Sequence, residues 1–144
     1  MTVTDSVVAS QARLEAQDAI LLDAGATHTI AEIAELTGVS AHTLRYYERI
    51  GLLDVARDAA GHRVYGARDV TRVVFLSRLR MTGMPIRELQ RYVELVGRGE
   101  ETVPERLAML QHHRDAIRTR IAELRFALDA VEYKITTYGG HCSP

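Results

Sequence analysis

Several features are scarce in this 144-residue chain, and each scarcity excludes a class of protein. A single cysteine excludes a framework of intramolecular disulfides. No apolar run is long enough to span a bilayer, and the N-terminus has no basic segment followed by an apolar core. The length fits one small domain and one additional long helix. We therefore expect a cytoplasmic protein with no membrane partner.

The formal net charge of −1 hides an asymmetry along the chain. Residues 1–39 hold one basic and six acidic side chains, which gives a net charge of −5. Residues 40–98 hold eleven basic and six acidic ones, a net of +5, and residues 99–144 hold six and seven, a net of −1. A phosphate-binding surface requires a local positive field, so the middle segment is the candidate for binding nucleic acid.

The segment before and after Gly38 has the pattern of a helix-turn-helix. Apolar residues at helical spacing predict a first short helix over residues 31–37, which Gly38 ends. Ser40 is a suitable N-cap for a second helix over residues 41–50, and Gly51 can close that helix in a left-handed conformation. Two short helices joined by a tight glycine turn are typical of a DNA-reading motif.

The second helix divides into an inner and an outer side. Leu44, Tyr47 and Ile50 are expected to face the first helix, although Tyr47 is equally compatible with a DNA contact. The outer side chains suit a major groove, because a guanidinium can bind guanine or phosphate and a hydroxyl can donate to a phosphate oxygen. The alternative is a solvated amphipathic helix. The candidate DNA-binding residues of this segment are Ser40, His42, Thr43, Arg45, Tyr46, Tyr47 and Arg49.

Residues 55–65 have the pattern of a hairpin, which would form the wing of a winged helix-turn-helix. Two stretches with strand character, 55–57 and 63–65, flank turn residues that include Gly61. Arg63 and Tyr65 lie two positions apart on a strand, so they would share one face and approach the sugar-phosphate backbone together. His62 is a further candidate contact at the wing. Without the preceding helices, such a hairpin would more often be an ordinary surface feature.

These motifs together resemble a known family. The stretch from Thr29 through Thr43-Leu-Arg-Tyr-Tyr-Glu-Arg-Ile-Gly-Leu-Leu to Gly61-His-Arg-Val-Tyr is similar to the N-terminal domain of MerR-type transcriptional regulators. The stretches beginning at Phe75, Glu100 and Tyr133 resemble the small branch that responds to aldehydes and other electrophiles. The resemblance covers roughly residues 28–138. It implies a homodimer that binds a palindromic promoter operator and distorts it so that RNA polymerase can engage both promoter elements.

The residues after the wing complete the expected DNA-binding domain, 28–98. Apolar periodicity predicts helices over 67–81 and 85–96, separated by Gly83 and ended by Gly97 and Gly99. The resemblance implies that this helix pair, 67–97, forms a second wing. Arg80 is then a candidate phosphate contact, with a solvated arginine as the equal alternative.

Residues 102–138 predict one long helix that begins at a capping box formed by Thr102 and Glu105. Its apolar residues follow a heptad pattern for about five repeats, and a helix roughly 50 Å long cannot bury that seam against so small a domain. We therefore expect a coiled-coil dimerisation helix, which the resemblance implies to be antiparallel. The predicted dimerisation residues are Leu107, Leu110, Arg114, Ile117, Ile121, Leu124, Leu128, Val131 and Ile135.

The sensing chemistry has little support in the sequence. Electrophile-responsive relatives carry a cysteine where this chain has Arg78, which cannot be alkylated or oxidised as a thiolate can. Cys142 and His141 lie in a short tail, 139–144, and His112 and His113 are adjacent and expected to be solvated. We therefore expect no cofactor and no metal site, no separate ligand-binding domain after the helix, and an unknown effector.

The sequence thus predicts a mainly α protein with a winged helix-turn-helix domain and a long dimerisation helix. Residues 1–27 are expected to be a flexible or weakly helical leader. The predicted function is sequence-specific transcriptional regulation rather than catalysis. Two alternatives remain open: a DNA-architectural or coiled-coil interaction protein without inducible control, and, more remotely, a small metal-dependent enzyme.

Overall fold

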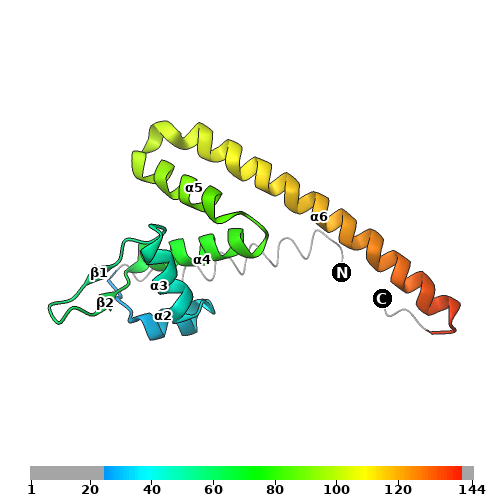
Figure 1. The fold of residues 1–144 in the computed structure, drawn as a ribbon, viewed down its shortest axis with the longest axis horizontal. Helices are drawn as coiled ribbons and strands as arrows, with labels where there is room; N and C mark the ends of the chain where they lie inside the picture. Colours follow the sequence, from blue (N-terminus) through cyan, green and yellow to red (C-terminus); the bar gives the residue numbers. More distant parts are fainter. Residues whose placement is uncertain (1–24, 141–144) are drawn as a thin grey trace. The chain divides into compact units, whose positions relative to one another are not determined.

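The computed structural model describes residues 25–140, and these fall into two units that meet between Val93 and Glu94. The first unit holds α2 (Ile30–Thr37), α3 (Ala41–Arg49), β1 (Ala56–Arg57), β2 (Arg63–Val64) and α4 (Ala67–Met81) (Figure 1). Helix α5 (Ile86–Arg98) runs across the division, and η1 (Glu100–Thr102) and α6 (Val103–Thr137) complete the second unit. The predicted mainly α fold class is confirmed.

Helix α2 begins at a capping box that the sequence analysis overlooked. The Thr29 hydroxyl accepts from the Glu32 amide at 3.2 Å, and the Glu32 carboxylate accepts from the Thr29 amide at 2.7 Å. Both groups satisfy amides that the first helical turn leaves unpaired. The helix ends at Gly38, whose φ of 72° lies in the left-handed region that glycine adopts without strain.

Helix α3 follows at once, in close contact with α2. The Ser40 hydroxyl accepts from the Thr43 amide at 3.1 Å, so Ser40 is the predicted N-cap. Leu44 and Tyr47 are buried, because they lie three positions apart on the face turned toward the core. The two short helices and their tight turn form the predicted helix-turn-helix.

The wing is the antiparallel pair β1–β2, in which Ala56 lies opposite Val64 and Arg57 lies opposite Arg63. At its tip the Asp58 carboxylate accepts from the amides of Ala60 and His62, each at 2.9 Å. At its base Tyr65 and His28 exchange two backbone hydrogen bonds of 2.9 Å. The wing is therefore joined to the residues that precede α2.

Helix α4 supplies much of the core of the first unit. Its apolar residues at spacings of three and four are buried, and it packs against α2. Gly83 has a φ of 102° and reverses the chain before α5. The buried apolar residues of this unit are Ile33, Leu44, Tyr47, Leu52, Leu53, Val55, Tyr65, Val70, Val73, Leu76, Leu79, Met84 and Leu89.

The junction between α5 and α6 contradicts the predicted capping box at Thr102. The Thr102 hydroxyl lies 2.6 Å from the Leu95 carbonyl oxygen and 2.7 Å from that of Gly99, so it serves the end of α5 rather than the start of α6. Arg106 Nε then donates to the same hydroxyl oxygen. The chain turns at Gly99, with φ 103°, and α5 runs through Gly97, where it was expected to end.

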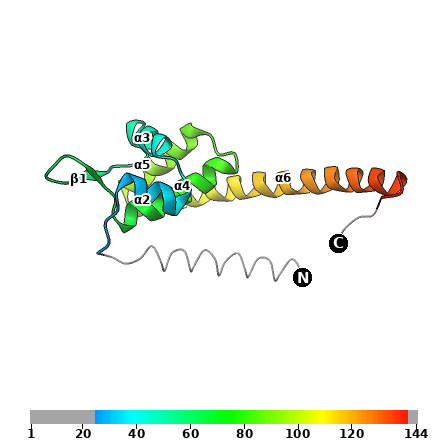
Figure 2. The ribbon, with the colours of Figure 1, turned by 90° about the horizontal axis from the view of Figure 1, so that it is seen from below.

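Helix α6 is one continuous helix of 35 residues (Figure 1, Figure 2). Its predicted seam is largely uncovered in the protomer, and Leu107, Leu124, Leu128 and Val131 are each more than half exposed. His113 departs from its prediction as a solvated residue, because only 6% of it is exposed. Cys142, His141 and the leader up to residue 24 lie outside the described residues. Within residues 25–140, no helix is long and apolar enough to cross a membrane.

Candidate nucleic-acid interface

The outer face of α3 carries the polar residues that the sequence assigned to DNA. His42, Arg45 and Arg49 are exposed, and Thr43 and Tyr46 are half-buried. The Arg49 guanidinium lies over the Tyr46 ring, 5.3 Å from its centre, which holds the two side chains together. This face therefore presents cations and hydroxyls together, as a major-groove or phosphate contact requires.

Tyr47 does not belong to that face, which corrects its assignment as a DNA contact. The residue is only 4% exposed. Burial raises the pKa of its hydroxyl, and a hydrogen bond with the Ser77 side chain on α4 opposes that rise. Tyr47 thus packs in the core, which was the alternative left open for it.

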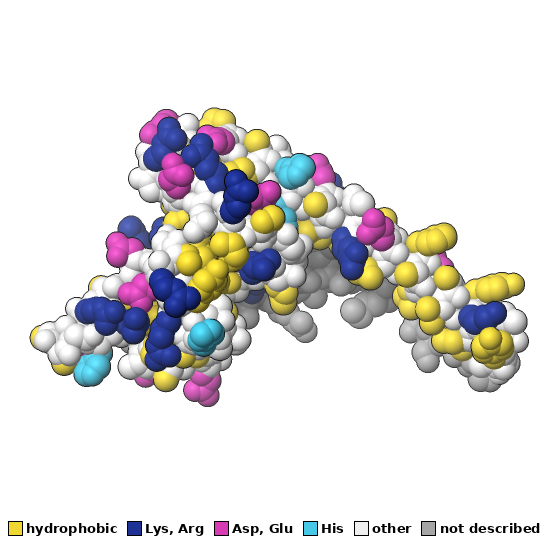
Figure 3. Space-filling view, viewed as in Figure 1, with side chains coloured by type: hydrophobic (Ala, Val, Ile, Leu, Met, Phe, Trp, Pro, Cys, Tyr) yellow, Lys and Arg dark blue, Asp and Glu magenta, His cyan; other side chains and the backbone are white. Residues whose placement is uncertain are grey.

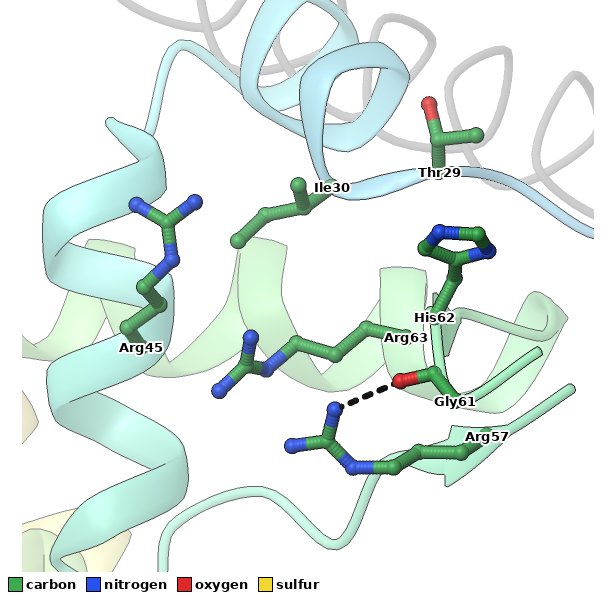
Figure 4. A pocket seen from close by; sticks show the side chains of 7 residues that line it. All are labelled: Thr29, Ile30, Arg45, Arg57, Gly61, His62 and Arg63. Atoms are coloured by element: carbon green, nitrogen blue, oxygen red, sulfur yellow. Dashed lines mark hydrogen bonds between the residues drawn. The ribbon is translucent and has the colours of Figure 1, made fainter.

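A hollow of about 310 Å³ lies between α3 and the wing (Figure 4). Arg45 lines it from α3, Arg57 and Arg63 line it from the two strands, and Thr29 and Ile30 line it where α2 begins. Figure 4 shows the three guanidinium groups directed into the same space. Three cations that converge from α3 and the two strands of the wing favour an anionic ligand, because their combined field adds at one place.

Arg63 has a protein partner in this arrangement. Its Nε donates to Oε2 of Glu48, on α3, at 2.5 Å, and this hydrogen bond raises the pKa of the guanidinium. Arg57 reaches the same carboxylate, with Nη2 3.7 Å from Oε1, and donates through Nη1 to the Gly61 carbonyl oxygen at 2.9 Å. Neither Glu48 nor Arg57 was among the residues expected from the sequence to belong to the site. The hairpin register, which places Arg57 opposite Arg63, was the one available indication.

Tyr65 contradicts the prediction that it approaches the sugar-phosphate backbone beside Arg63. Its side chain is fully buried, and burial raises the pKa of its hydroxyl. No group in the described part of the chain is a hydrogen-bond partner for that hydroxyl. Tyr65 lies just beyond β2, at the bridge with His28, and its side chain packs in the core while that of Arg63 stays partly exposed.

The remaining predicted contacts lie at the surface of the first unit. His62 is exposed at the wing tip, with Nδ1 3.4 Å from the Asp58 carboxylate. The amides of His62 and Ala60 hold the pKa of Asp58 below its ordinary value. Arg80 is exposed on the last turn of α4. In Figure 3, dark blue arginine side chains gather on the wing and beside it.

Comparison with known proteins now decides the family. Residues 28–95 match the family model described as MerR HTH family regulatory protein, and residues 70–132 match the one described as MerR, DNA binding. An HTH-type transcriptional regulator of Haemophilus influenzae is 38% identical over 113 residues, which cover 78% of this chain and 84% of the relative. The chain belongs to the MerR family.

Solved structures support the same assignment for this MerR-family chain. One is HiNmlR, a MerR family regulator lacking the sensor domain, in complex with promoter DNA. It is 37% identical, with a TM-score of 0.74 over 79% of this chain and 91% of that one. A MerR family protein from Listeria monocytogenes is 38% identical, with a TM-score of 0.74 over 79% and 87%. The chain is therefore a MerR-family transcriptional regulator with a DNA-binding domain, and its relatives are regulators rather than enzymes.

Proposed function

We propose that this MerR-family chain acts as a homodimer on a two-fold symmetric operator within a promoter. The observation that carries the proposal is the convergence of Arg45 from α3 with Arg57 and Arg63 from the wing around one hollow. A recognition helix in the major groove and a wing on the adjacent backbone would each contribute cations to the same stretch of DNA.

The residues that do this work divide by their expected partner. Arg45 is the candidate for direct readout, because an exposed arginine on the outer face of a recognition helix can bind guanine through two hydrogen bonds. The other side chains would contact phosphate and fix the register of the domain on the duplex. They are Ser40, His42, Thr43, Tyr46, Arg49, His62 and Arg80.

Dimerisation would place two DNA-binding domains on one operator. The exposed apolar seam of α6 supports dimerisation, because a two-stranded coil would remove this seam from water. The resemblance to the MerR family implies that the pairing is antiparallel. A two-fold symmetric dimer presents two identical DNA-binding domains, so we expect the operator to be palindromic. Arg114 would be a polar residue within this seam, and its Nε lies 3.0 Å from the Asp115 carboxylate.

Regulation would then work through the shape of the promoter. A dimer that bends and untwists a promoter with an overlong spacer would let RNA polymerase engage both promoter elements. The energy term is DNA deformation rather than additional base contacts. HiNmlR, which is similar over 79% of this chain, was crystallised on promoter DNA. We infer that the protein works in the cytoplasm, where bacterial promoters are transcribed.

Transcription from a purified template tests the proposal. The template is the DNA upstream of the protein's own gene, transcribed by RNA polymerase with and without the regulator. The wild-type protein and the matched charge control Arg120→Ala should change the transcript level severalfold, and Arg45→Ala should not. Arg120 is exposed on α6 and pairs with Glu123 of the same helix at 3.7 Å. Binding without any change in transcript would favour the architectural alternative.

A further inference from the structure

The carboxylate of Glu48 joins both strands of the wing to α3, the proposed recognition helix. Glu48 lies in the last turn of α3, and its two oxygens face Arg63 at 2.5 Å and Arg57 at 3.7 Å. The side chain of Glu48 is 22% exposed and that of Arg63 is 27% exposed, so this pair is partly shielded from solvent. A shielded, charge-assisted hydrogen bond contributes more than an exposed ion pair does.

The hairpin register explains why this carboxylate matters. Arg57 and Arg63 are directly opposite each other across the β1–β2 pair, and directly opposite residues project from the same face. Two like charges in that position repel and destabilise the pair. Glu48, which comes from a different element, supplies the negative charge that both arginines need.

The wing has no second attachment of this kind within residues 25–140. At its base, the backbone pair between His28 and Tyr65 joins it to the segment before α2. At its tip, the hydrogen bonds of Asp58, and that of Arg57 with Gly61, stay within the hairpin. Among the hydrogen bonds and ion pairs of the described residues, those of Glu48 are the ones that join α3 to the wing.

We propose that Glu48 is a positioning residue for DNA recognition, which sets the angle and distance between the recognition helix and the wing. This inference rests on the proposed function, because it assumes that α3 and the wing engage one half-site together. A fixed geometry lets Arg45 and the wing arginines meet groove and backbone without ordering the wing during binding. The carboxylate itself touches no DNA and repels phosphate.

This role makes an unusual prediction for Glu48→Gln. Removal of a negative charge beside DNA should leave binding to random sequence unchanged or make it tighter, because that binding depends on net positive charge. Binding to the operator should nevertheless weaken by roughly tenfold, because the wing loses a charged hydrogen bond that fixes its position. The ratio of operator affinity to random-sequence affinity should therefore fall.

The experiment measures that ratio for the full chain on a duplex that carries the operator and on a shuffled duplex of the same composition. The matched control is Glu35→Gln, which removes one exposed negative charge from α2 rather than from the pairing between α3 and the wing. Its ratio should stay within twofold of wild type. An equal ratio for Glu48→Gln and Glu35→Gln would overturn the proposal. Footprints should show that Glu48→Gln loses protection where the wing meets the backbone and keeps it in the groove.

A second variant covers the case in which Glu48→Gln does not fold. Glu48→Asp keeps the charge but is one methylene shorter, so it cannot reach both arginines and should also lower the ratio. An unchanged ratio for this variant would overturn the positioning role, because it would show that charge alone is sufficient.

A measurement without DNA separates this inference from the proposed function. Backbone ¹⁵N relaxation of residues 58–62 should show a more mobile wing in Glu48→Gln than in wild type or Glu35→Gln. Equal wing mobility in all three proteins would overturn the inference. If the wing becomes mobile in Glu48→Gln but the wild-type protein shows no preference for any operator, the role of Glu48 in fixing the wing is supported and the proposed function fails.

Discussion

Leu124→Asp in the middle of α6 should convert the protein from a dimer to a monomer. Leu124 is 56% exposed in the protomer, and this exposed part is the area that a coiled coil would bury. Complete burial of a leucine contributes about 1.5–3 kcal/mol, so two half-exposed leucines give roughly 2–3 kcal/mol. Each aspartate placed in the seam adds a desolvation cost of several kcal/mol. The total of about 5 kcal/mol or more weakens the dimer over a thousandfold.

Sedimentation equilibrium measures this change, and α6 offers a matched control. Phe126 is 78% exposed, more than Leu124, but it lies two residues further along. Two residues correspond to about 200° around a helix, so Phe126 is on the side opposite the seam. Phe126→Asp should therefore stay a dimer. The seam assignment is refuted if Leu124→Asp keeps the wild-type dimer affinity, or if Phe126→Asp dissociates equally.

Three further substitutions test the DNA-binding domain. Arg45→Ala should weaken operator binding by about 1–3 kcal/mol and random-sequence binding much less, and equal losses in a competition assay would remove Arg45 from direct readout. Thr29→Ala breaks the capping box of α2 and should cost about 1 kcal/mol in chemical denaturation, whereas Thr71→Ala within α4 should cost little. Tyr65→Phe should leave the free energy of unfolding unchanged or raise it by up to about 1 kcal/mol. A decrease of more than about 1 kcal/mol would show that the hydroxyl has a hydrogen-bond partner.

The helices were predictable because their boundaries are local. Gly38 ends α2, and Ser40 begins α3 as its N-cap, and both follow from residue type and from the apolar spacing beside them. Gly83 likewise separates α4 from α5. Each of these residues acts on backbone groups within four positions, so the sequence pattern contains the whole cause.

The errors came from residues whose partners are distant in sequence or chemically ambiguous. Thr102 has the spacing of a capping residue, but the carbonyl oxygens at the end of α5 engage its hydroxyl instead. Tyr47 and Tyr65 carry a ring and a hydroxyl, so each could be assigned to the core or to DNA, and the fold buries both. Whether a tyrosine on an amphipathic element lies in the core or at the surface depends on what packs over it. Residue spacing alone does not show this.

The pairing of Glu48 with Arg63 belongs to the same class, because fifteen residues separate them. Arg63 was expected to contact DNA because of its place on the wing, and no sequence pattern indicated a carboxylate on α3 as its partner. In the structure, Arg63 lines the hollow and binds Glu48 at the same time. Its positive charge thus remains near the proposed DNA surface, while its position depends on the recognition helix.

A footprint of the purified protein on the DNA upstream of its own gene and the neighbouring operon tests the central claim most directly. At physiological salt, we expect one protected site of two-fold symmetry, with distorted base pairs at its centre and backbone protection on both flanks. Uniform weak protection without a preferred site, from protein that is still dimeric, would contradict sequence-specific promoter binding.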